Sequence, residues 1–349
     1  MNNNLVVALS VGQSKIGAGA IDYQGNLVCL LDEIATPQDT SARYAAVAQQ
    51  ILAVIHEVGL PNVSYVGISY PELVPPPPRV VANLEILPTT ADPIHDAIAV
   101  LVSKALDSTI KIELMHDAAA AALGEVSPKG TLPGCQNCIF IVWGTGVASG
   151  IISGGKLYWH DPIIHMMTGE AGLQVIRTAT GAFAYSPLAH IPELGPSELR
   201  FDRWLRGPEI AQRFREEIRI DGRGPALLEL ANKSPEEIDL IDINRVAREN
   251  DPLAIQLIES AGQEMGQALA PFIAYWFVER KMAFAKTIII GSGVAKLGDG
   301  LNRAGQGILI SAIRRAIEDT LSSLGVYGYN TSNVILSEIG YEREFYAFI

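Results

Sequence analysis

The stretch that decides the fold is residues 5–26, LVVALSVGQSKIGAGAIDYQGN. Leu5–Ser10 and Ser14–Ile21 have the apolar and small residues of buried strands, and the short link between them predicts a hairpin. Asp22–Asn26 has the residues of a tight turn, and Leu27–Leu31 after it predicts a third strand. Three strands with such short connections indicate an antiparallel meander at the edge of a larger sheet.

Helices and strands alternate after this meander. Thr40 or Ser41 is expected to cap the first helix. The elements predicted in turn are a helix over 40–58, a strand over 64–69, a helix from 92, a strand over 109–115 and an Ala-rich helix over 117–125. This alternation predicts a mixed sheet that is covered on both faces.

The same pattern then starts again. Pro128–Gln136 is a junction rich in turn-forming residues, and Cys138–Trp143 and Val147–Ser153 predict two strands around the turn Gly144-Thr145-Gly146. Pro271 is expected to kink or interrupt a long helix that starts at residue 251. A strand over 287–290, a helix over 306–324 and a strand over 334–337 complete the prediction. We therefore expect two α/β domains, 1–127 and 128–349.

The composition of the chain argues against some classes of partner and location. The chain has 349 residues, of which 48% are hydrophobic, and its net charge is −12, which argues against nucleic acid as a partner. It contains no apolar run of about 18 residues or more, so no membrane span is expected. Three cysteines suit a reducing compartment, which predicts a cytoplasmic protein. Cys135 and Cys138 are either ordinary reduced thiols, a redox pair or half of a metal site.

Three turns of small residues are candidate phosphate sites. They are Gly12-Gln13-Ser14 with Lys15, Gly144-Thr145-Gly146, and Gly291-Ser292-Gly293. Such turns expose backbone N–H groups that can surround an anion, although hairpins use glycine for their geometry whether or not they bind a ligand.

These segments, in their order, resemble the ROK family (repressors, open reading frames, kinases) within the superfamily of actin, hexokinase and the heat-shock chaperones. The resemblance covers nearly the whole chain. It rests on the hairpin at 5–26, similar to D-x-G-G-T-K; His116–Glu125, similar to N-D-A-N-A-A-A-L-G-E; Gly144–Ile152, similar to a second phosphate hairpin; Gly169–Gly172, similar to the start of G-E-I-G-H; Gly207–Ile210, similar to the helix start after a zinc loop; and Ile290–Val294, similar to an adenosine-contacting turn.

The resemblance implies two ribonuclease-H-like domains of the actin and sugar-kinase type, with an interdomain cleft and a last segment that packs back on the first domain. It implies phosphorylation of a sugar hydroxyl by ATP with Mg²⁺, the three turns binding ATP and Asp117 acting as the general base. Without the resemblance, Asp117 is equally an N-cap of the helix that follows it. Glu170, His116 and Asn83 match or replace contacts to the sugar.

The sequence departs from the family pattern at several of these positions. Ser10 replaces the aspartate that helps to position magnesium, Gln13 replaces a glycine of the same turn, and Ala119 replaces an asparagine. Leu173 replaces the histidine of G-E-I-G-H, and residues 177–206 contain no cysteine, so neither a structural zinc nor any other metal ligand set is expected.

We therefore expect a kinase for a sugar-like molecule other than glucose, such as an amino sugar or a cyclitol. The alternatives are a ligand-binding or regulatory protein that has lost the chemistry and lacks a DNA-binding domain, or an ATP-using enzyme with different chemistry. A homodimer is possible, but the sequence identifies no interface.

Overall fold

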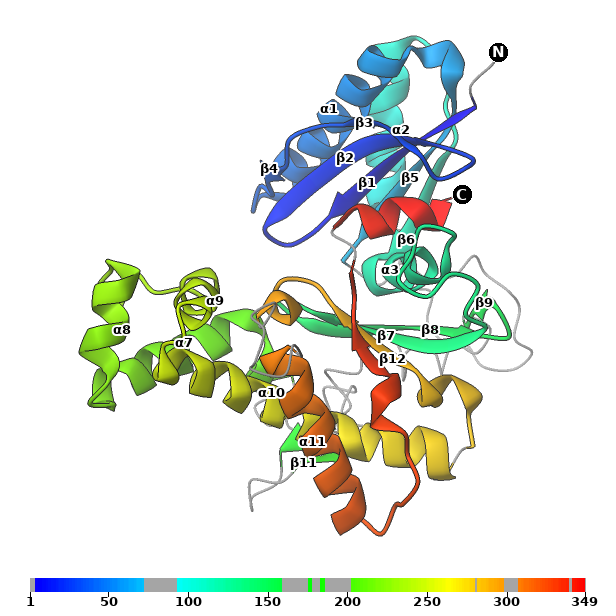
Figure 1. The fold of residues 1–349 in the computed structure, drawn as a ribbon. Coiled ribbons are helices and arrows are strands. Elements are labelled where there is room, and N and C mark those ends of the chain that lie inside the picture. Colours follow the sequence, from blue (N-terminus) through cyan, green and yellow to red (C-terminus); the bar gives the residue numbers. More distant parts are fainter. Residues whose placement is uncertain are drawn as a thin grey trace. The chain divides into compact units, whose positions relative to one another are not determined.

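The computed structural model describes residues 4–71, 93–158, 175–177, 183–185, 202–279, 281–297, 307–338 and 341–348. The chain divides into two compact units, Met1–Cys135 with Ile339–Ile349, and Gln136–Glu338. Each unit contains one large mixed β-sheet (Figure 1). This confirms the predicted α/β class.

The first unit has a six-stranded sheet in which antiparallel and parallel pairs meet at β1. The strands run β3-β2-β1-β5-β6, with β4 also paired to β2; β2 is antiparallel to β1 and β3, whereas β5 and β6 run parallel to β1. The strands are β1 Leu5–Val11, β2 Lys15–Asp22, β3 Leu27–Leu30, β4 Ile34–Ala35, β5 Val63–Tyr70 and β6 Ile112–His116. The helical elements are α1 Thr40–Val58, η1 Leu60–Asn62, α2 Pro93–Leu106, α3 Asp117–Val126 and η7 Tyr341–Phe348.

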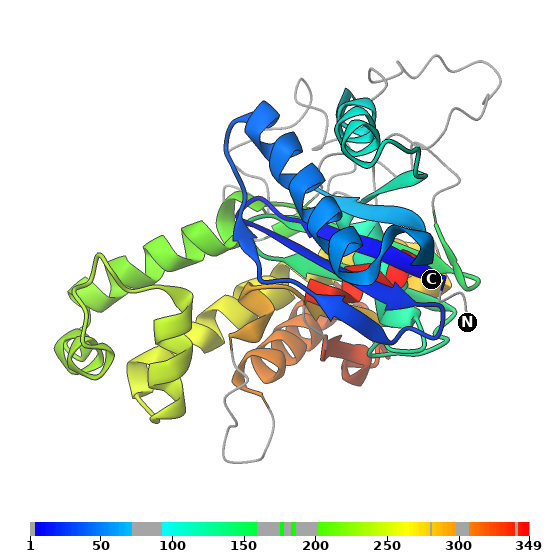
Figure 2. The ribbon, with the colours of Figure 1, turned by 90° about the horizontal axis from the view of Figure 1, so that it is seen from above.

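Side chains of β1 alternate between two separate cores, as the period of a strand requires. Val7 and Leu9 belong to the core that includes Ile51 of α1 and Ile98 of α2. Val6 and Ala8, on the opposite face, pack with Phe345 and Phe348 of η7. Seen from above, α1 lies over the strands of this sheet (Figure 2). The sheet of the first unit is therefore covered on both faces, one of them by the last segment of the chain.

The first helix spans the expected residues, but its N-cap lies one residue earlier than the sequence analysis expected. Asp39, rather than Thr40 or Ser41, is its N-cap, and the Asp39 carboxylate accepts a hydrogen bond of 2.8 Å from the N–H of Ala42. A carboxylate at this position also interacts favourably with the positive end of the helix dipole. The helix ends at Gly59, whose φ of 81° few other residues adopt.

The second unit repeats the strand order of the first. Its large sheet runs β9-β8-β7-β12-β13, antiparallel on the β8 side of β7 and parallel on the β12 side, and a two-stranded sheet pairs β10 with β11. The strands are β7 Asn137–Trp143, β8 Val147–Ser153, β9 Lys156–Leu157, β10 Val175–Arg177, β11 Phe183–Tyr185, β12 Ile288–Gly291 and β13 Val334–Leu336. The helical elements are α6 Asp202–Leu205, α7 Gly207–Ile220, α8 Gly224–Ala231, α9 Leu240–Arg248, α10 Pro252–Ile273, η3 Ala274–Glu279, η4 Ala283–Lys286, η5 Val294–Lys296, α11 Ile308–Ser323 and η6 Thr331–Asn333.

The long helix α10 supports this second sheet together with α11. Gly262 and Gly266 allow close packing, because an added Cβ at Gly266 would lie 2.4 Å from the carbonyl oxygen of Ile313 in α11. Pro271 does not interrupt α10, which continues to Ile273 and then widens into the π-helical η3. The change of pitch follows the position where proline lacks the N–H that an α-helical turn requires.

The three cysteines form no disulfide; Cys138 is buried in β7, and Cys135 is half-buried before it. Within the described ranges, no helix is long and apolar enough to cross a membrane.

The packing of η7 on the first sheet can be tested at Gly67 of β5, since an added Cβ there would lie 2.3 Å from Cγ of Phe348. We expect Gly67→Ala to lower the free energy of unfolding by about 1–3 kcal/mol and Phe348→Ala by about 3–5 kcal/mol. In the double variant the new methyl group occupies part of the space left by the ring, so urea unfolding should give a loss smaller than the sum of the two. An additive double variant would show that these residues do not touch.

Candidate active site

The first candidate phosphate turn connects β1 to β2, and hydrogen bonds to its carbonyl oxygens hold its conformation. The N–H of Gly12 donates to the carbonyl oxygen of Lys15 at 2.8 Å, and buried Thr36 donates to the carbonyl oxygens of Gly12 and Ser14. In the described part of the chain, the N–H groups of Gln13 and Ser14 make no hydrogen bond. Neither residue has a positive φ, so the glutamine that replaces a glycine here introduces no backbone strain.

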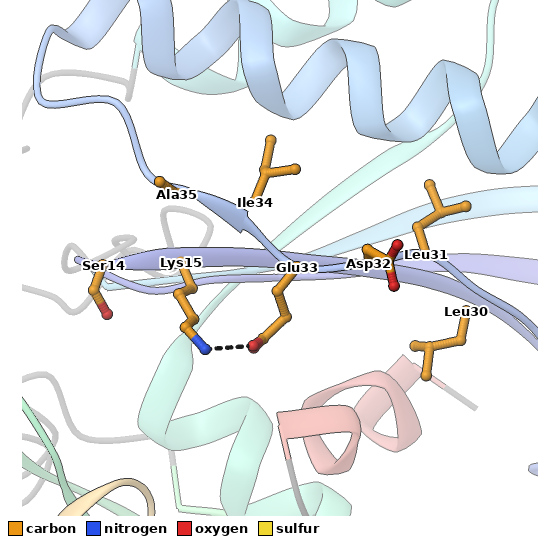
Figure 3. Close-up of a pocket in the computed structure, with 8 residues that line it drawn as sticks. All are labelled: Ser14, Lys15, Leu30, Leu31, Asp32, Glu33, Ile34 and Ala35. Atoms are coloured by element: carbon orange, nitrogen blue, oxygen red, sulfur yellow. Dashed lines mark hydrogen bonds and ion pairs between the residues drawn. The ribbon is translucent and has the colours of Figure 1, made fainter. Parts of the chain in front are cut away.

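Lys15, the cation of this turn, is directed to a carboxylate. Its ammonium nitrogen lies 2.7 Å from Oε2 of Glu33 (Figure 3). The pair borders an open hollow of about 630 Å³ that also includes Asp32. The residues lining the hollow are Ser14, Lys15, Leu30, Leu31, Asp32, Glu33, Ile34 and Ala35. The hollow contains two carboxylates and only one ammonium group, so its net negative charge would repel a polyphosphate. Lys15 itself is still available to an anion. Its side chain is 62% exposed, and an exposed ion pair such as the one with Glu33 is weak enough to be replaced.

Ser10 lies one residue before the end of β1 and is almost buried. Its partner in the adjacent parallel strand β5 is Ser69, which is fully buried. Each side chain follows the face of Val6 and Ala8, the face that η7 covers. The carboxyl ends of parallel strands are the edge at which open α/β sheets bind ligands, so two hydroxyl groups are placed at that edge.

His116 ends β6 and presents a buried imidazole. Only 2% of its side chain is exposed, and burial lowers its pKa to about 4, so the ring is neutral at pH 7. Its Nε2 lies 3.5 Å from Oδ1 of Asp117, whereas its Nδ1 has no hydrogen-bond partner among the described residues. A buried polar atom without a partner costs about 1–3 kcal/mol, so the Nδ1 of His116 requires an explanation, of which a bound ligand or water is one.

Asp117 starts α3 directly after the strand. Its Oδ1 accepts a hydrogen bond of 2.6 Å from the N–H of Ala118, and 23% of its side chain remains exposed. Burial raises the pKa of this carboxyl group from 3.8 to about 6, and the hydrogen bond from Ala118 partly opposes the rise. Asp117 does not act as the N-cap that the sequence left open, since His116 occupies that position. A carboxylate with a pKa close to neutrality suits a general base.

The second and third candidate turns meet in the second unit. Gly144-Thr145-Gly146 connects β7 to β8, and Ser292 follows the end of β12, which runs parallel to β7. A Cβ added at Gly144 would lie 2.9 Å from Oγ of Ser292. Ser292 has a φ of 85°, which is unusual for serine and strained by about 1–3 kcal/mol. Strain of this kind is concentrated at ligand sites, which favours a role in binding for this turn.

The sequence analysis noted Gly207 as a helix start but did not assign it to the site. The N–H of Gly207 donates to the carbonyl oxygen of Gly144 at 2.7 Å, and an added Cβ would lie 3.1 Å from that oxygen. Trp143 fixes the preceding segment, because its buried indole N–H donates to the carbonyl oxygen of Leu205 at 2.5 Å. The Gly207-Pro208 dipeptide was the available signal, but nothing in the local sequence indicated that Gly207 contacts Gly144.

The residues present suit a nucleotide and a magnesium ion. Turns at 144–146 and 291–293 leave backbone without large side chains, and no neighbour would meet a Cβ at Gly146 or Gly293. In the first unit, hydroxyl and carboxylate oxygens stand at one sheet edge, and oxygen is the ligand type that Mg²⁺ prefers. Among the described residues, no group of three His, Cys, Asp or Glu side chains could hold a metal directly. Asn83 and Glu170 lie outside the described residues.

Comparison with known proteins agrees with this fold. The sequence model of the ROK family matches residues 6–172. A glucokinase from Streptomyces coelicolor is 24% identical over 304 residues, which are 84% of this chain and 84% of that protein. The crystal structure of a ROK family glucokinase from Streptomyces griseus, in complex with glucose and AMPPNP, has a TM-score of 0.70 at 21% identity, covering 99% of this chain and 97% of that one. A ROK family transcriptional regulator, a homologue of the Escherichia coli MLC protein, has a TM-score of 0.61 at 18% identity, covering 99% and 77%.

The raised pKa of Asp117 makes a prediction about stability. A carboxyl group whose pKa is higher in the folded than in the unfolded chain stabilises most below pH 3.8, and that contribution is lost as the pH rises through about 6. Asp117→Asn keeps an oxygen for the N–H of Ala118 but never ionises. We therefore expect it to stabilise the protein by about 1–3 kcal/mol at pH 7.5 and by nearly nothing at pH 4. Thermal unfolding at both pH values measures this, and an equal effect at both would contradict the assigned cause.

Proposed function

The chain carries a ROK family domain over residues 6–172, and from this premise we propose that it transfers a phosphoryl group from ATP to a hydroxyl group of a sugar or sugar-like small molecule. The observation that carries the proposal is Asp117, a partly exposed carboxyl group with a raised pKa where β6 passes into α3. Its carboxylate accepts the proton of the attacking hydroxyl, as the base of a kinase must.

The other residues of the proposed site hold the reactants. The unpartnered Nδ1 of His116 is positioned to exchange a hydrogen bond with a substrate hydroxyl, which supplies the partner that the folded chain lacks. The N–H groups of the 12–15 turn and the ammonium group of Lys15 bind phosphate oxygens. The turns at 144–146 and 291–293 accommodate the nucleotide, and Asn83 and Glu170 complete the contacts to the sugar. Bound Mg²⁺ would neutralise charge on the phosphates.

The acceptor we propose is not glucose but a related polyol, amino sugar or cyclitol. His116 provides a ring nitrogen where the ROK pattern has the side-chain amide of asparagine, and Ala119 provides no polar group where the pattern has a second asparagine. A neutral imidazole offers one donor and one acceptor, whereas an amide offers two of each, so the hydroxyl groups it can satisfy differ in number and direction.

The role of Asp117 predicts the pH dependence of turnover. Because a base must be ionised, we expect kcat/KM for the acceptor to be level above pH 7 and to fall about tenfold per unit below an apparent pKa of about 6. Asp117→Asn should reduce kcat by about 10²–10⁴-fold. Initial rates between pH 5 and 8.5 measure both effects. A profile without an acidic limb, or a variant that retains activity, would exclude Asp117 as the base.

The proposed reaction is tested by calorimetric titration with ATP and Mg²⁺, followed by a panel of sugars, amino sugars and cyclitols. One panel member should bind to the protein–nucleotide complex, and product formation with that member should release ADP. Glucose as the best acceptor would contradict the proposed substrate class but keep the kinase. A protein that binds no nucleotide would contradict the whole proposal.

Ser10 favours a second function. A neutral residue at the end of β1 leaves that strand without a carboxylate for magnesium, and a transcriptional regulator is among the solved structures of similar fold. A regulatory protein that binds a sugar without ATP is consistent with the serine at position 10 and with this structural similarity. Sugar binding that is independent of nucleotide, with no ADP release for any acceptor, would establish this second function.

A further inference from the structure

The start of α7 lies against the turn between β7 and β8, which is distant from it in the sequence. The N–H of Gly207 donates to the carbonyl oxygen of Gly144 at 2.7 Å. A Cβ added at Gly207 would lie 3.1 Å from that oxygen and 3.3 Å from Cγ2 of Val294, both closer than ordinary van der Waals contact. The close approach of the two backbones therefore depends on glycine at position 207.

The segment that carries this N–H group is anchored in the core of the second unit. Leu205 is fully buried, and its carbonyl oxygen accepts a hydrogen bond of 2.5 Å from the indole N–H of Trp143, the last residue of β7. Trp143 is itself fully buried and directly precedes Gly144. Two hydrogen bonds, one on each side of position 206, thus join the start of α7 to the end of β7. The position of the Gly207 N–H does not depend on its own hydrogen bond alone.

The hydrogen bond from Gly207 sets the orientation of the peptide group between Gly144 and Thr145. In a trans peptide group the C=O and N–H bonds lie in one plane and point in opposite directions, and the described residues contain no cis peptide bond. Because the carbonyl oxygen of Gly144 is directed to α7, the N–H of Thr145 is directed away from α7. In the part of the chain that the structure describes, the N–H groups of Thr145 and Gly146 make no hydrogen bond. Both donors remain available to a ligand.

Only one orientation of this peptide group suits an anion. With the carbonyl oxygen of Gly144 bound to Gly207, the turn presents N–H groups, which carry partial positive charge and bind phosphate oxygens. In the reverse orientation the same peptide group would present its carbonyl oxygen, whose partial negative charge repels phosphate. Rotation between the two meets little steric resistance at Gly144, because glycine has no side chain. A partner outside the turn is needed to fix the orientation, and Gly207 is such a partner.

We propose that Gly207 is a positioning residue for nucleotide binding, because its N–H group holds the 144–146 turn in the orientation that directs the N–H of Thr145 to a phosphate group of ATP. The inference rests on the proposed function and adds to it a residue outside the three candidate turns. In this role Gly207 acts through Gly144 rather than on the nucleotide itself. Its effect therefore falls on the binding of the phosphate groups and not on the binding of adenosine.

The test compares Gly207→Ala with the unmodified protein, because the added methyl group displaces the carbonyl oxygen of Gly144. Calorimetric titration should show that the affinity for ATP falls roughly tenfold or more, which corresponds to the loss of one hydrogen bond to a charged group. The affinity for adenosine should not change. In turnover assays the KM for ATP should rise, whereas the KM for the acceptor should stay the same.

Gly222→Ala is the matched control, since it adds the same methyl group at an exposed turn of the same unit, where no neighbouring atom lies within 4 Å. It should change neither affinity. If Gly207→Ala weakens ATP and adenosine equally, or weakens neither, the inference is overturned while the kinase proposal stays intact. Unmodified protein that binds neither ATP nor adenosine would overturn the proposed function and this inference together.

If Gly207→Ala is too unstable to assay, amide hydrogen exchange in the unmodified protein is the second test. The N–H of Gly207 should be protected from exchange with and without a ligand. The N–H of Thr145 should exchange rapidly in the free protein and become protected when ATP binds, but not when adenosine binds. A Thr145 N–H that ATP does not protect, or a Gly207 N–H that exchanges rapidly in the free protein, would overturn the inference.

Discussion

The parallel pairing of strands that are distant in sequence is the constraint on which the rest of the structure depends. In the first unit it places β5 beside β1 and β6 beside β5, and in the second it places β12 beside β7 and β13 beside β12. Because parallel strands end at the same edge, their C-terminal residues become neighbours without any local interaction. Ser10 thereby meets Ser69, and Gly144 meets Ser292. The hairpins at 12–15 and 144–146 occupy equivalent places because each follows the central strand of its sheet.

Two residues at the edge of the first sheet lower the stability of the folded chain. His116 keeps a buried nitrogen without a partner in the described structure, and Asp117 is a carboxyl group whose ionised form is penalised by burial. Neither feature helps the chain to fold: the first costs a hydrogen bond, and the second makes the neutral-pH state less stable than an amide would. Adjacent residues that both oppose folding are consistent with the proposed substrate site, because perturbed groups of this kind are concentrated at functional sites.

Much of this architecture could be predicted from local sequence, because each strand and helix is specified by its own residues. The apolar runs of β1 and β2, the turn at 22–26 and the helix over 40–58 all lie within a residue or two of their predicted bounds. Two local details differ from the prediction. Asp39 caps the helix in place of Thr40 or Ser41, and Pro271 does not interrupt α10, which continues to Ile273 before it widens. The contacts of Gly207 with Gly144 and of Glu344 with Ser69 could not be predicted in this way. They depend on which elements become neighbours in three dimensions, and a single sequence does not record that.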